Sequence, residues 1–374
     1  MNTRMETYLV GGAVRNFLLG RPIKERDWVV VGATESQMLS CGYKKVGLAF
    51  PVFLHPVTHE EYALARIEHK TGKGYTQFAC CADPNITLIE DLRRRDLTIN
   101  AIAQTSAGEL IDPYGGKEDL KNKILHHVSS AFAEDPVRVL RVARFAAKLG
   151  DFTVHPETLC MMHAILIAGE LDALVPERVW QELKSALDEQ NPERFFEVLQ
   201  DCGALIKLFP EVAANLDRVL MSLKQAVATS KDPLIRFAAA IGVLSKEEAV
   251  TICKRYRVPR AYLDLAKFTA MHKEIYRQIL DSDPKMILSL FDFIDAYRNH
   301  TRLEQLLTTF EITARCSEHE NTPLDITTAP RIVFLKNAYK KAKNVDIKSL
   351  VDTGISGEKL REKIRELRLK AIAK

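Results

Sequence analysis

Short apolar runs alternate with turn residues over the first 130 residues of the chain, and many of their positions are β-branched. Runs of this length and composition, bounded by glycine, proline and polar clusters, are typical of strands. Two helical patterns interrupt them, at Ala13–Leu19 and near Leu97–Ile102. The pattern predicts an N-terminal α/β domain with strands at Tyr8–Val10, Trp28–Val31, Val52–Leu54, Tyr62–Ala65, Leu110–Asp112 and Ile124–Val128.

After Ser130 the apolar residues recur at helical spacing in long amphipathic segments, and glycine and proline separate these segments. The polar stretch Ser317–Pro330 contains two prolines and is predicted to be a loop. The remainder of the chain is therefore expected to be mainly helical, with helices that include Val137–Leu149, Glu177–Leu187, Arg194–Asp201, Pro233–Leu244 and Lys359–Ala373.

Composition is that of an ordinary globular protein. The chain has 374 residues, of which 47% are hydrophobic and 27% charged, and this excludes wholesale disorder. The net charge of +4 hides an uneven distribution, because residues 331–374 carry a net charge of +8 and residues 1–330 a net charge of −4. A basic tail of this kind suits a polyanion such as RNA, although a helix with merely solvated charges has the same pattern.

Seven cysteines are scattered along the chain, and no two of them form a C-x-x-C pair. This usage indicates neither a secreted disulfide framework nor a zinc finger, so a reducing cytoplasm is the expected location. The N-terminal segment lacks the apolar stretch of a signal peptide, and no apolar run approaches the length of a membrane span. No membrane association is therefore expected, and the oligomeric state is left open.

Paired glycines follow the first predicted strand in the segment Gly-Gly-x-Val-Arg. Gly12 would open a helix whose first turn carries Arg15. Glycine lets backbone N–H groups approach an anion closely, and the helix N-terminus favours negative charge. The segment is a candidate phosphate-binding turn, and a plain tight turn is the alternative reading.

Two carboxylates flank the start of the second predicted strand. Residues two apart in a strand point to the same side, so Glu25 and Asp27 are expected to face one site. Hard oxygen ligands of this kind hold Mg²⁺, while a nucleoside triphosphate supplies further ligands. A solvated charge cluster is the alternative from spacing alone.

Taken together with the later motifs, these segments resemble the class II tRNA nucleotidyltransferases, the CCA-adding enzymes of the polymerase β superfamily. The resemblance covers residues 8 to about 215, and the rest of the chain is similar mainly in being helical. The later motifs are Arg-Arg-Asp at Arg94–Asp96, a hinge-like motif beginning at Asp112, Glu-Asp-Pro-Val-Arg at Glu134–Arg138, and Glu177–Glu182.

The resemblance implies an α+β fold with a polymerase β-like nucleotidyltransferase head at residues 1–130. An all-α neck at 131–215, a body at 216–330 and a basic tail at 331–374 would follow. The implied reaction is template-independent addition of CCA to the 3′ end of tRNA from CTP and ATP, with release of pyrophosphate and with Mg²⁺ held by Glu25 and Asp27. Glu177–Glu182 would stabilise neighbouring helices without contacting substrate.

Base selection is assigned by the resemblance to Asp135 and Arg138, which are three residues apart in a predicted helix and would share a face. Cytosine and adenine both offer an amino donor beside a ring-nitrogen acceptor, and a carboxylate and a guanidinium complement these groups. UTP and GTP present the opposite polarity. An ion-paired, solvated helix face is the alternative for such a motif in isolation.

The resemblance also assigns phosphate binding to three arginines, and a guanidinium suits this role because it makes bidentate contacts to phosphate oxygens. Asp96 and Asn100 would contact the ribose or cap the helix near them. The three arginines are Arg95, Arg141 and Arg144.

Two positions depart from the family pattern. Glu25 replaces the usual aspartate at the first metal position and remains a hard oxygen ligand, whereas Asn16 replaces an aspartate and leaves Arg15 less neutralised. These departures motivate one alternative, a non-catalytic RNA-binding relative. A poly(A) polymerase and a CC-adding enzyme are the others, and residues 66–78, which resemble the flexible loop associated with addition of the terminal A, disfavour the latter.

Some bacterial relatives carry an additional metal-dependent phosphohydrolase domain marked by an adjacent His-Asp pair. This chain has no His-Asp dipeptide, so no such hydrolase activity is expected.

Overall fold

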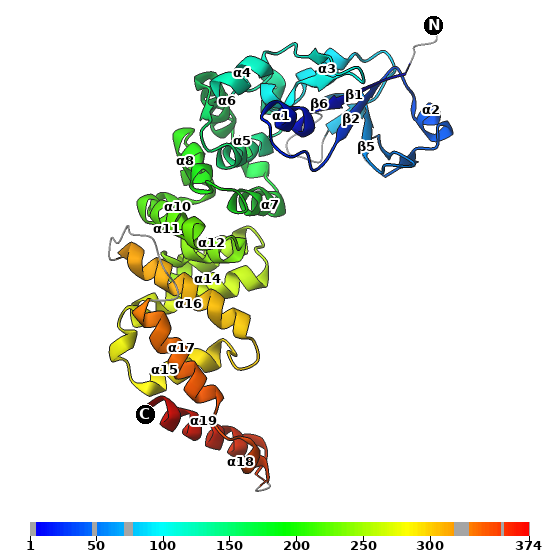
Figure 1. Cartoon of the computed structure of the whole chain (residues 1–374). Helices are drawn as coiled ribbons and strands as arrows, with labels where there is room; N and C mark the ends of the chain where they lie inside the picture. The colour runs from blue at the N-terminus through cyan, green and yellow to red at the C-terminus, as the bar shows by residue number, and fades with distance from the viewer. Residues whose placement is uncertain (1–4, 47–50, 71–77, 318–328, 353–354, 374) are drawn as a thin grey trace. The chain divides into compact units, whose positions relative to one another are not determined.

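The computed structural model describes residues 5–46, 51–70, 78–317, 329–352 and 355–373. It contains two compact units. Unit 1 comprises Met1–Ala186 with Arg194–Leu208, and unit 2 comprises Leu187–Glu193 with Phe209–Lys374. The α/β part lies in unit 1 and unit 2 is helical, which confirms the expected α+β class (Figure 1). The finer boundaries at residues 130, 215 and 330 stay predictions.

Unit 1 is built around a mixed sheet with the strand order β3-β4-β5-β2-β1-β8-β9. Neighbouring strands are antiparallel except for the parallel pair β2 and β5. Most of the predicted strands are confirmed, with ends that differ by one or two residues. The strands are β1 (Glu6–Val10), β2 (Asp27–Val31), β3 (Lys44–Lys45), β4 (Val52–Leu54), β5 (Glu61–Leu64), β8 (Ala103–Gln104) and β9 (Leu110–Ile111).

Both faces of this sheet are covered by helices. Successive side chains of the central strand β2 point to opposite sides of the sheet, so neighbouring residues of β2 pack against different helices. Val29 packs in a buried cluster with Leu88 and Leu92 of α3 (Leu88–Arg93). Val30 packs in a second cluster with Met38 of α2 (Glu35–Ser40). A continuous valine run is what a doubly covered strand requires, and it leaves the start of the strand as the place for polar side chains.

The predicted helix near Leu97–Ile102 is wrong. The structure has one 3-10 turn there, η1 (Thr98–Asn100), closed by hydrogen bonds from Asn100 N to Leu97 O and from Ala101 N to Thr98 O. Backbone groups at the start of this turn form hydrogen bonds with another segment: Thr98 N donates to His126 O, and Leu97 forms a β-bridge with His127. These tertiary bonds compete with helix propagation, and the local sequence does not reveal them.

The predicted strand Ile124–Val128 is shorter than expected. The strand is limited to β10 (Ile124–Leu125), which pairs in parallel with β11 (Thr153–Val154), and His127 makes only the isolated bridge to Leu97. A separate hairpin joins β6 (Ile67–Lys70) to β7 (Phe78–Cys81). Residues 67–70 and 78 of the predicted flexible loop at 66–78 thus belong to paired strands, and its residues 71–77 lie outside the described part of the chain.

The helices of unit 1 follow the amphipathic pattern of the sequence. The longest predicted one is α5 (Val137–Lys148), whose inner face buries Val139, Leu140 and Ala143. The others are α1 (Gly12–Leu18), α4 (Gly116–Asn122), η2 (Ser130–Glu134), α6 (Pro156–Ile167), η3 (Glu170–Ala173), α7 (Pro176–Leu187), α8 (Glu193–Asp201) and α9 (Ala204–Leu208).

Unit 2 is organised around α12 (Pro233–Gly242), whose residues from Ile235 to Gly242 are all buried. A Cβ added at Gly242 would lie 2.5 Å from Thr269 Cγ2, so α12 and α14 pack at a distance that only glycine allows. The helices around it are α10 (Pro210–Ala213), α11 (Leu216–Thr229), α13 (Lys246–Arg255), α14 (Arg260–Arg277), η4 (Ile279–Asp281), α15 (Pro284–Phe293) and α16 (His300–Ser317).

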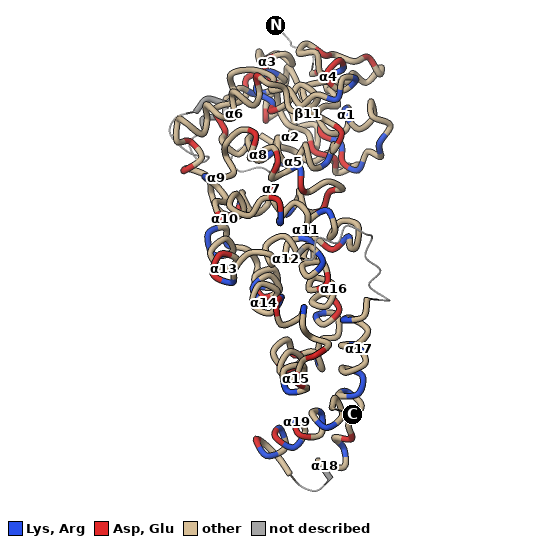
Figure 2. Tube along the Cα trace, turned by 90° about the vertical axis from the view of Figure 1, so that its left-hand side faces the viewer, with Lys and Arg blue, Asp and Glu red and all other residues tan. Residues whose placement is uncertain are grey.

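The basic tail forms α17 (Pro330–Lys343), α18 (Lys348–Asp352) and α19 (Gly357–Ala373). Of the predicted loop Ser317–Pro330, residues 318–328 lie outside the described part, and its two end residues terminate α16 and begin α17. Basic positions recur along α17 and α19 (Figure 2). Among the described residues, no helix combines the length and the apolar character that a membrane span requires.

Candidate functional site

A cleft of about 670 Å³ opens in unit 1, and all of the predicted site residues line it. Sheet, η1 and α5 contribute its walls. The predicted residues on its surface are Gly12, Arg15, Glu25, Asp27, Arg95, Asp96, Asn100, Asp135, Arg138, Arg141 and Arg144. Sequence reasoning missed several further cationic residues of the cleft, namely Arg66, Arg94 and Lys148, and it did not place Arg178 there.

Asp27 is the first residue of β2, and Glu25 lies two residues before the strand. The prediction that both belong to the strand is wrong for Glu25, although both residues line the cleft. No hydrogen bond or salt bridge joins either carboxylate to another of the described residues. Burial of the carboxyl by the cleft walls raises the pKa of Asp27; the Arg95 cation opposes this effect and the Glu25 charge reinforces it.

This carboxylate pair fits a divalent cation. Asp27 pays a desolvation cost and an additional repulsion from Glu25, and a bound cation would remove both. The donor set consists of carboxylate oxygens, which hard ions such as Mg²⁺ prefer, and the wide cleft leaves room for substrate oxygens.

The glycine turn brings Arg15 to the cleft. Gly11 has φ +69° and ψ −127°, a backbone conformation that strongly favours glycine, and a Cβ there would lie 3.2 Å from Arg95 Nη1. Arg15 is 4% exposed; its Nη1 donates to Asn100 Oδ1 and its guanidinium lies over the Phe145 ring.

Asn16, the departure from the family pattern, accepts a hydrogen bond from Arg15 Nη2 at 3.1 Å. The amide therefore still contacts the arginine, without neutralising its charge.

Asp96 is the central acceptor of the Arg-Arg-Asp motif. Its Oδ1 accepts from Leu97 N at 2.8 Å and from Asn100 Nδ2 at 3.0 Å, and its Oδ2 accepts from Arg141 Nε at 2.8 Å. Burial alone would raise the pKa of this carboxyl, but the Arg141 cation and these hydrogen bonds hold the pKa far below its usual range. Asp96 is thus ionised and joins η1 to α5.

Asp91 was not identified from the sequence, although it orients two arginines of the cleft. The residue is fully buried, and its carboxylate accepts from Arg94 Nη2 at 2.8 Å and from Arg95 Nη2 at 3.2 Å. It also accepts from the backbone N–H of Arg66 at 3.3 Å. The sequence does contain a signal for this contact. Asp91 lies three residues before Arg94 and four before Arg95, and this spacing brings side chains together on a helix.

Asp135 and Arg138 line the cleft, but they do not share a helix face. The helix begins at Val137, and extended Asp135 precedes it and accepts from Val137 N with Oδ1 at 3.0 Å. Arg138 is 9% exposed and donates to Ala131 O at 2.7 Å and to Arg94 O at 2.6 Å. The proline at position 136 favours this change from extended chain to helix, because the residue before proline avoids helical backbone angles.

Arg144 pairs with Glu182 of α7, Nε to Oε2 at 2.5 Å, and its guanidinium lies 4.7 Å from the centroid of the Phe145 ring. The ion pair joins α5 to α7, which is the helix-stabilising role expected of the Glu177–Glu182 motif. The cleft as a whole therefore combines two unpaired carboxylates at the start of β2 with arginines that are already oriented by buried acids.

Comparison with known proteins agrees with the motifs and the fold described above. The chain matches the Poly A polymerase head domain over residues 7–126 and the probable RNA and SrmB-binding site of polymerase A over residues 151–216. A CCA-adding enzyme of Coxiella burnetii is 49% identical over 370 residues, which cover 99% of this chain and 95% of the relative. A multifunctional CCA protein of Nitrosococcus oceani is 47% identical over 403 residues, 98% of each chain.

A solved CCA-adding enzyme of Thermotoga maritima, complexed with tRNA-CCA, has the same fold, with a TM-score of 0.69 and 21% identity over 98% of this chain and 87% of the other. The full-length identity with the curated relatives agrees with the motifs and with the fold. The chain belongs to the CCA-adding enzymes, a family of tRNA nucleotidyltransferases.

Proposed function

We propose that this protein adds the 3′-terminal CCA to tRNA from CTP and ATP and releases pyrophosphate. The observation that carries the proposal is the cleft, in which Glu25 and Asp27, two carboxylates with no hydrogen bond or salt bridge to another described residue, lie together with a set of oriented arginines. Relatives at 47–49% identity bear the name of this activity. CCA-adding enzymes of this fold have been solved in complex with ATP and with CTP. The substrates indicate that the protein acts in the cytoplasm.

Glu25 and Asp27 would hold the divalent ions, for which Mg²⁺ is the proposed species. In a two-metal nucleotidyl transfer such ions lower the pKa of the attacking 3′-hydroxyl and neutralise the leaving pyrophosphate. No covalent intermediate with the protein is required, because the hydroxyl attacks the α-phosphate in line.

The arginines bind and orient the triphosphate. Arg95, Arg141 and Arg144 are each paired with a buried or half-buried acid, so their guanidinium planes are fixed before the nucleotide arrives. A group oriented in advance loses little side-chain freedom on binding, and its remaining N–H groups can meet phosphate oxygens.

Arg15 and the backbone at Gly12 would complete the phosphate contacts at the start of α1. Asn100, which accepts from Arg15, ties this turn to Asp96.

Asp135 and Arg138 are proposed to select the base. Asp135 uses only one carboxylate oxygen on the Val137 N–H, so Oδ2 can accept from the exocyclic amino group of cytosine or adenine. Arg138 is anchored by two backbone carbonyls, which hold its guanidinium at the cleft as the proposed donor to a ring nitrogen. Both bases present this donor and acceptor pair, whereas uracil and guanine do not.

Incubation with Mg²⁺, CTP, ATP and tRNAs that end before CCA, after C or after CC tests the proposal. The proposal expects all three substrates to be extended to CCA. Addition of a single nucleotide type, open-ended addition of A, or no addition would each contradict it.

Asp27→Ala tests the metal assignment, with Glu109→Ala as the matched control because Glu109 is an exposed carboxylate outside the cleft. We expect activity to be lost in the first variant and kept in the second. Retained activity in Asp27→Ala would refute the assignment.

The basic tail is proposed to contact tRNA through exposed lysines of α17. Several other basic groups of the tail are engaged within unit 2, including Lys336 with Glu304 at 2.8 Å and Arg365 with Asp292 at 2.8 Å. Lys340 and Lys341 are exposed. Replacing both by glutamate should weaken tRNA binding and reduce its salt dependence. An unchanged salt dependence would refute this contact.

A further inference from the structure

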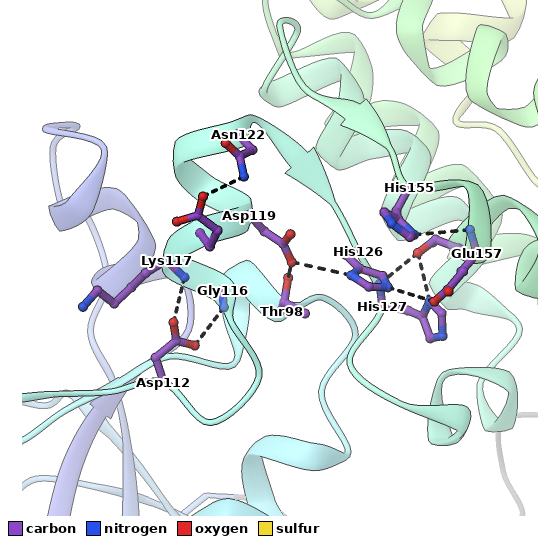
Figure 3. A network of polar contacts seen from close by, with 12 residues as sticks. Thr98, Asp112, Gly116, Lys117, Asp119, Asn122, His126, His127, His155 and Glu157 are labelled. Carbon is purple, nitrogen blue, oxygen red and sulfur yellow. Dashed lines mark hydrogen bonds and ion pairs between the residues drawn. The ribbon is translucent and has the colours of Figure 1, made fainter.

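Two histidines and a glutamate gather in unit 1 away from the nucleotide cleft, at the ends of the strand pair β10 and β11 (Figure 3). Leu125 and Val154 are partners in this parallel pair. The next residue of each strand, His126 and His155, therefore leaves the pair on the same side, and Glu157 follows in the first turn of α6. The topology thus brings His126 together with His155 and Glu157, which are 29 and 31 residues further along the chain.

The spacing of the three groups is close to that of a metal coordination shell. One ligand atom from each residue lies within 4.8 Å of the others, and His126 Nε2 is 3.5 Å from Glu157 Oε2. The His126 and His155 rings are stacked with centroids 4.0 Å apart. Tetrahedral ligands bound at about 2.0–2.1 Å are separated from one another by about 3.3 Å, so one ligand pair already has this spacing and the third needs a small side-chain movement.

A carboxylate lies behind His126. Asp119 Oδ2 lies 3.7 Å from His126 Nδ1, on the side of the ring away from Glu157 (Figure 3). Asp119 is itself held by the Thr98 hydroxyl, which donates to Oδ2. A histidine that ligates a metal typically presents its other ring N–H to such a carboxylate, and this arrangement leaves Nε2 as the free ligand atom.

His155 makes one local bond that binding would change. Its Nδ1 accepts from the Glu157 backbone N–H at 3.3 Å, which is a long hydrogen bond. Ligation through Nε2 takes the tautomer with the proton on Nδ1 and releases this bond. Neighbouring His127 is not part of this group of ligand atoms, and its Nδ1 instead lies 2.9 Å from the Thr158 hydroxyl.

We propose that His126, His155 and Glu157 bind a divalent transition-metal ion, with Zn²⁺ as the preferred species and water as the fourth ligand. Two imidazoles and one carboxylate are a common protein ligand set for zinc. Imidazole nitrogen distinguishes this site from the oxygen-only pair Glu25 and Asp27, which suits Mg²⁺. The bound ion would fasten the segment after β10 to the start of α6, and through Asp119 and Thr98 to η1.

The experiment uses the full chain, stripped of metal with EDTA, freed of the chelator and titrated with Co²⁺ in the presence of excess Mg²⁺. Magnesium occupies oxygen-ligand sites and leaves the imidazole site to Co²⁺. We expect one equivalent of Co²⁺ to bind with the visible absorption of a tetrahedral complex, and one equivalent of Zn²⁺ to displace it.

Variants locate the site. His126→Asn and His155→Asn should each abolish this absorption, and Asp119→Asn should weaken Co²⁺ binding by about 10- to 100-fold. His59→Asn is the matched control, because His59 is exposed, outside the cluster and in a left-handed conformation that asparagine tolerates. Its titration should equal that of the original chain.

Circular dichroism and Mg²⁺-dependent CTP incorporation by His126→Asn show whether that variant is folded. A folded His126→Asn chain that still gives the one-equivalent absorption, or an original chain with no saturable Co²⁺ or Zn²⁺ binding, would overturn the proposal.

Discussion

Asp91 should contribute more to the stability of unit 1 than any single surface charge, because it is fully buried and faces two arginines. In Asp91→Asn the side chain keeps its shape and loses its charge. The side chains of Arg94 and Arg95 are only 16% and 19% exposed, so water compensates them poorly. Leaving a buried ion partner uncompensated costs about 3–5 kcal/mol, and that is the expected fall in the free energy of unfolding.

Urea denaturation followed by tryptophan fluorescence measures this change in unit 1 specifically. The chain has two tryptophans, Trp28 and Trp180, and both belong to unit 1. The same variant should lose orientation of Arg95 in the cleft. If the misoriented Arg95 loses one charge-assisted hydrogen bond to the triphosphate, the loss of about 1.5–3 kcal/mol corresponds to a fall of about 10- to 100-fold in kcat/KM for CTP.

Glu90→Gln is the control, since Glu90 is the neighbouring exposed acid of α3 and caps that helix at Thr87. The free energy of unfolding of Glu90→Gln should fall by about 1 kcal/mol or less, and this variant should keep its activity. If Asp91→Asn were no less stable than Glu90→Gln, the carboxylate would not be holding the arginines and the reasoning would fail.

Three further outcomes are expected. Gly11→Ala should destabilise unit 1 by about 1–3 kcal/mol in the same urea titration, because alanine would have to adopt a backbone conformation that favours glycine. The same variant should raise the KM for nucleotide, because its new Cβ would contact Arg95. Lys273→Met should lower the thermal unfolding temperature of unit 2. The Lys273 ammonium donates hydrogen bonds to backbone carbonyls at the C-terminal end of α12, and such charged hydrogen bonds contribute about 1.5–3 kcal/mol. The ionised Asp96, with its depressed pKa, stabilises the fold above about pH 4, so urea stability should fall as pH drops below that value, and Asp96→Asn should flatten this dependence.

Each of these has a matched control. Gly20 also has a positive φ but has no atom within 4 Å of an added Cβ, so Gly20→Ala reports backbone strain alone and should leave the KM unchanged. Lys254→Met removes an exposed lysine of α13 and should not shift the transition of unit 2, which is followed by far-ultraviolet circular dichroism. Equal effects in Gly11→Ala and Gly20→Ala, or in the two lysine variants, would contradict the contacts described here, and an acid transition unchanged by Asp96→Asn would contradict its assignment.

Local pattern was sufficient for most strands and helices. The valine run of β2 and the amphipathic segment of α5 owe their structure to burial of apolar faces, which the sequence records directly. The pattern failed at Thr98–Asn100, where hydrogen bonds to His126 and His127 prevent a helix, and at Asp135, which precedes its helix. At Thr98–Asn100 backbone groups from a distant segment compete with local structure, whereas at Asp135 the proline that follows keeps the chain extended before the helix.

By itself, the sequence determined the fold class, the family and many of the residues that line the cleft, because these depend on apolar periodicity and on ordered motifs; it did not reveal Arg66, Arg94 or Lys148 as cleft residues. Tertiary structure alone decided which acid holds which arginine where the two residues come from distant segments. Whereas Asp91 pairs with Arg95 at a helical spacing that the sequence already contains, Asp96 pairs with Arg141 because η1 and α5 converge there. The same holds for His126 and His155, which are ordinary histidines in the sequence and neighbours only because β10 and β11 run parallel. Pairing across segments follows from the path of the backbone, which no local spacing encodes.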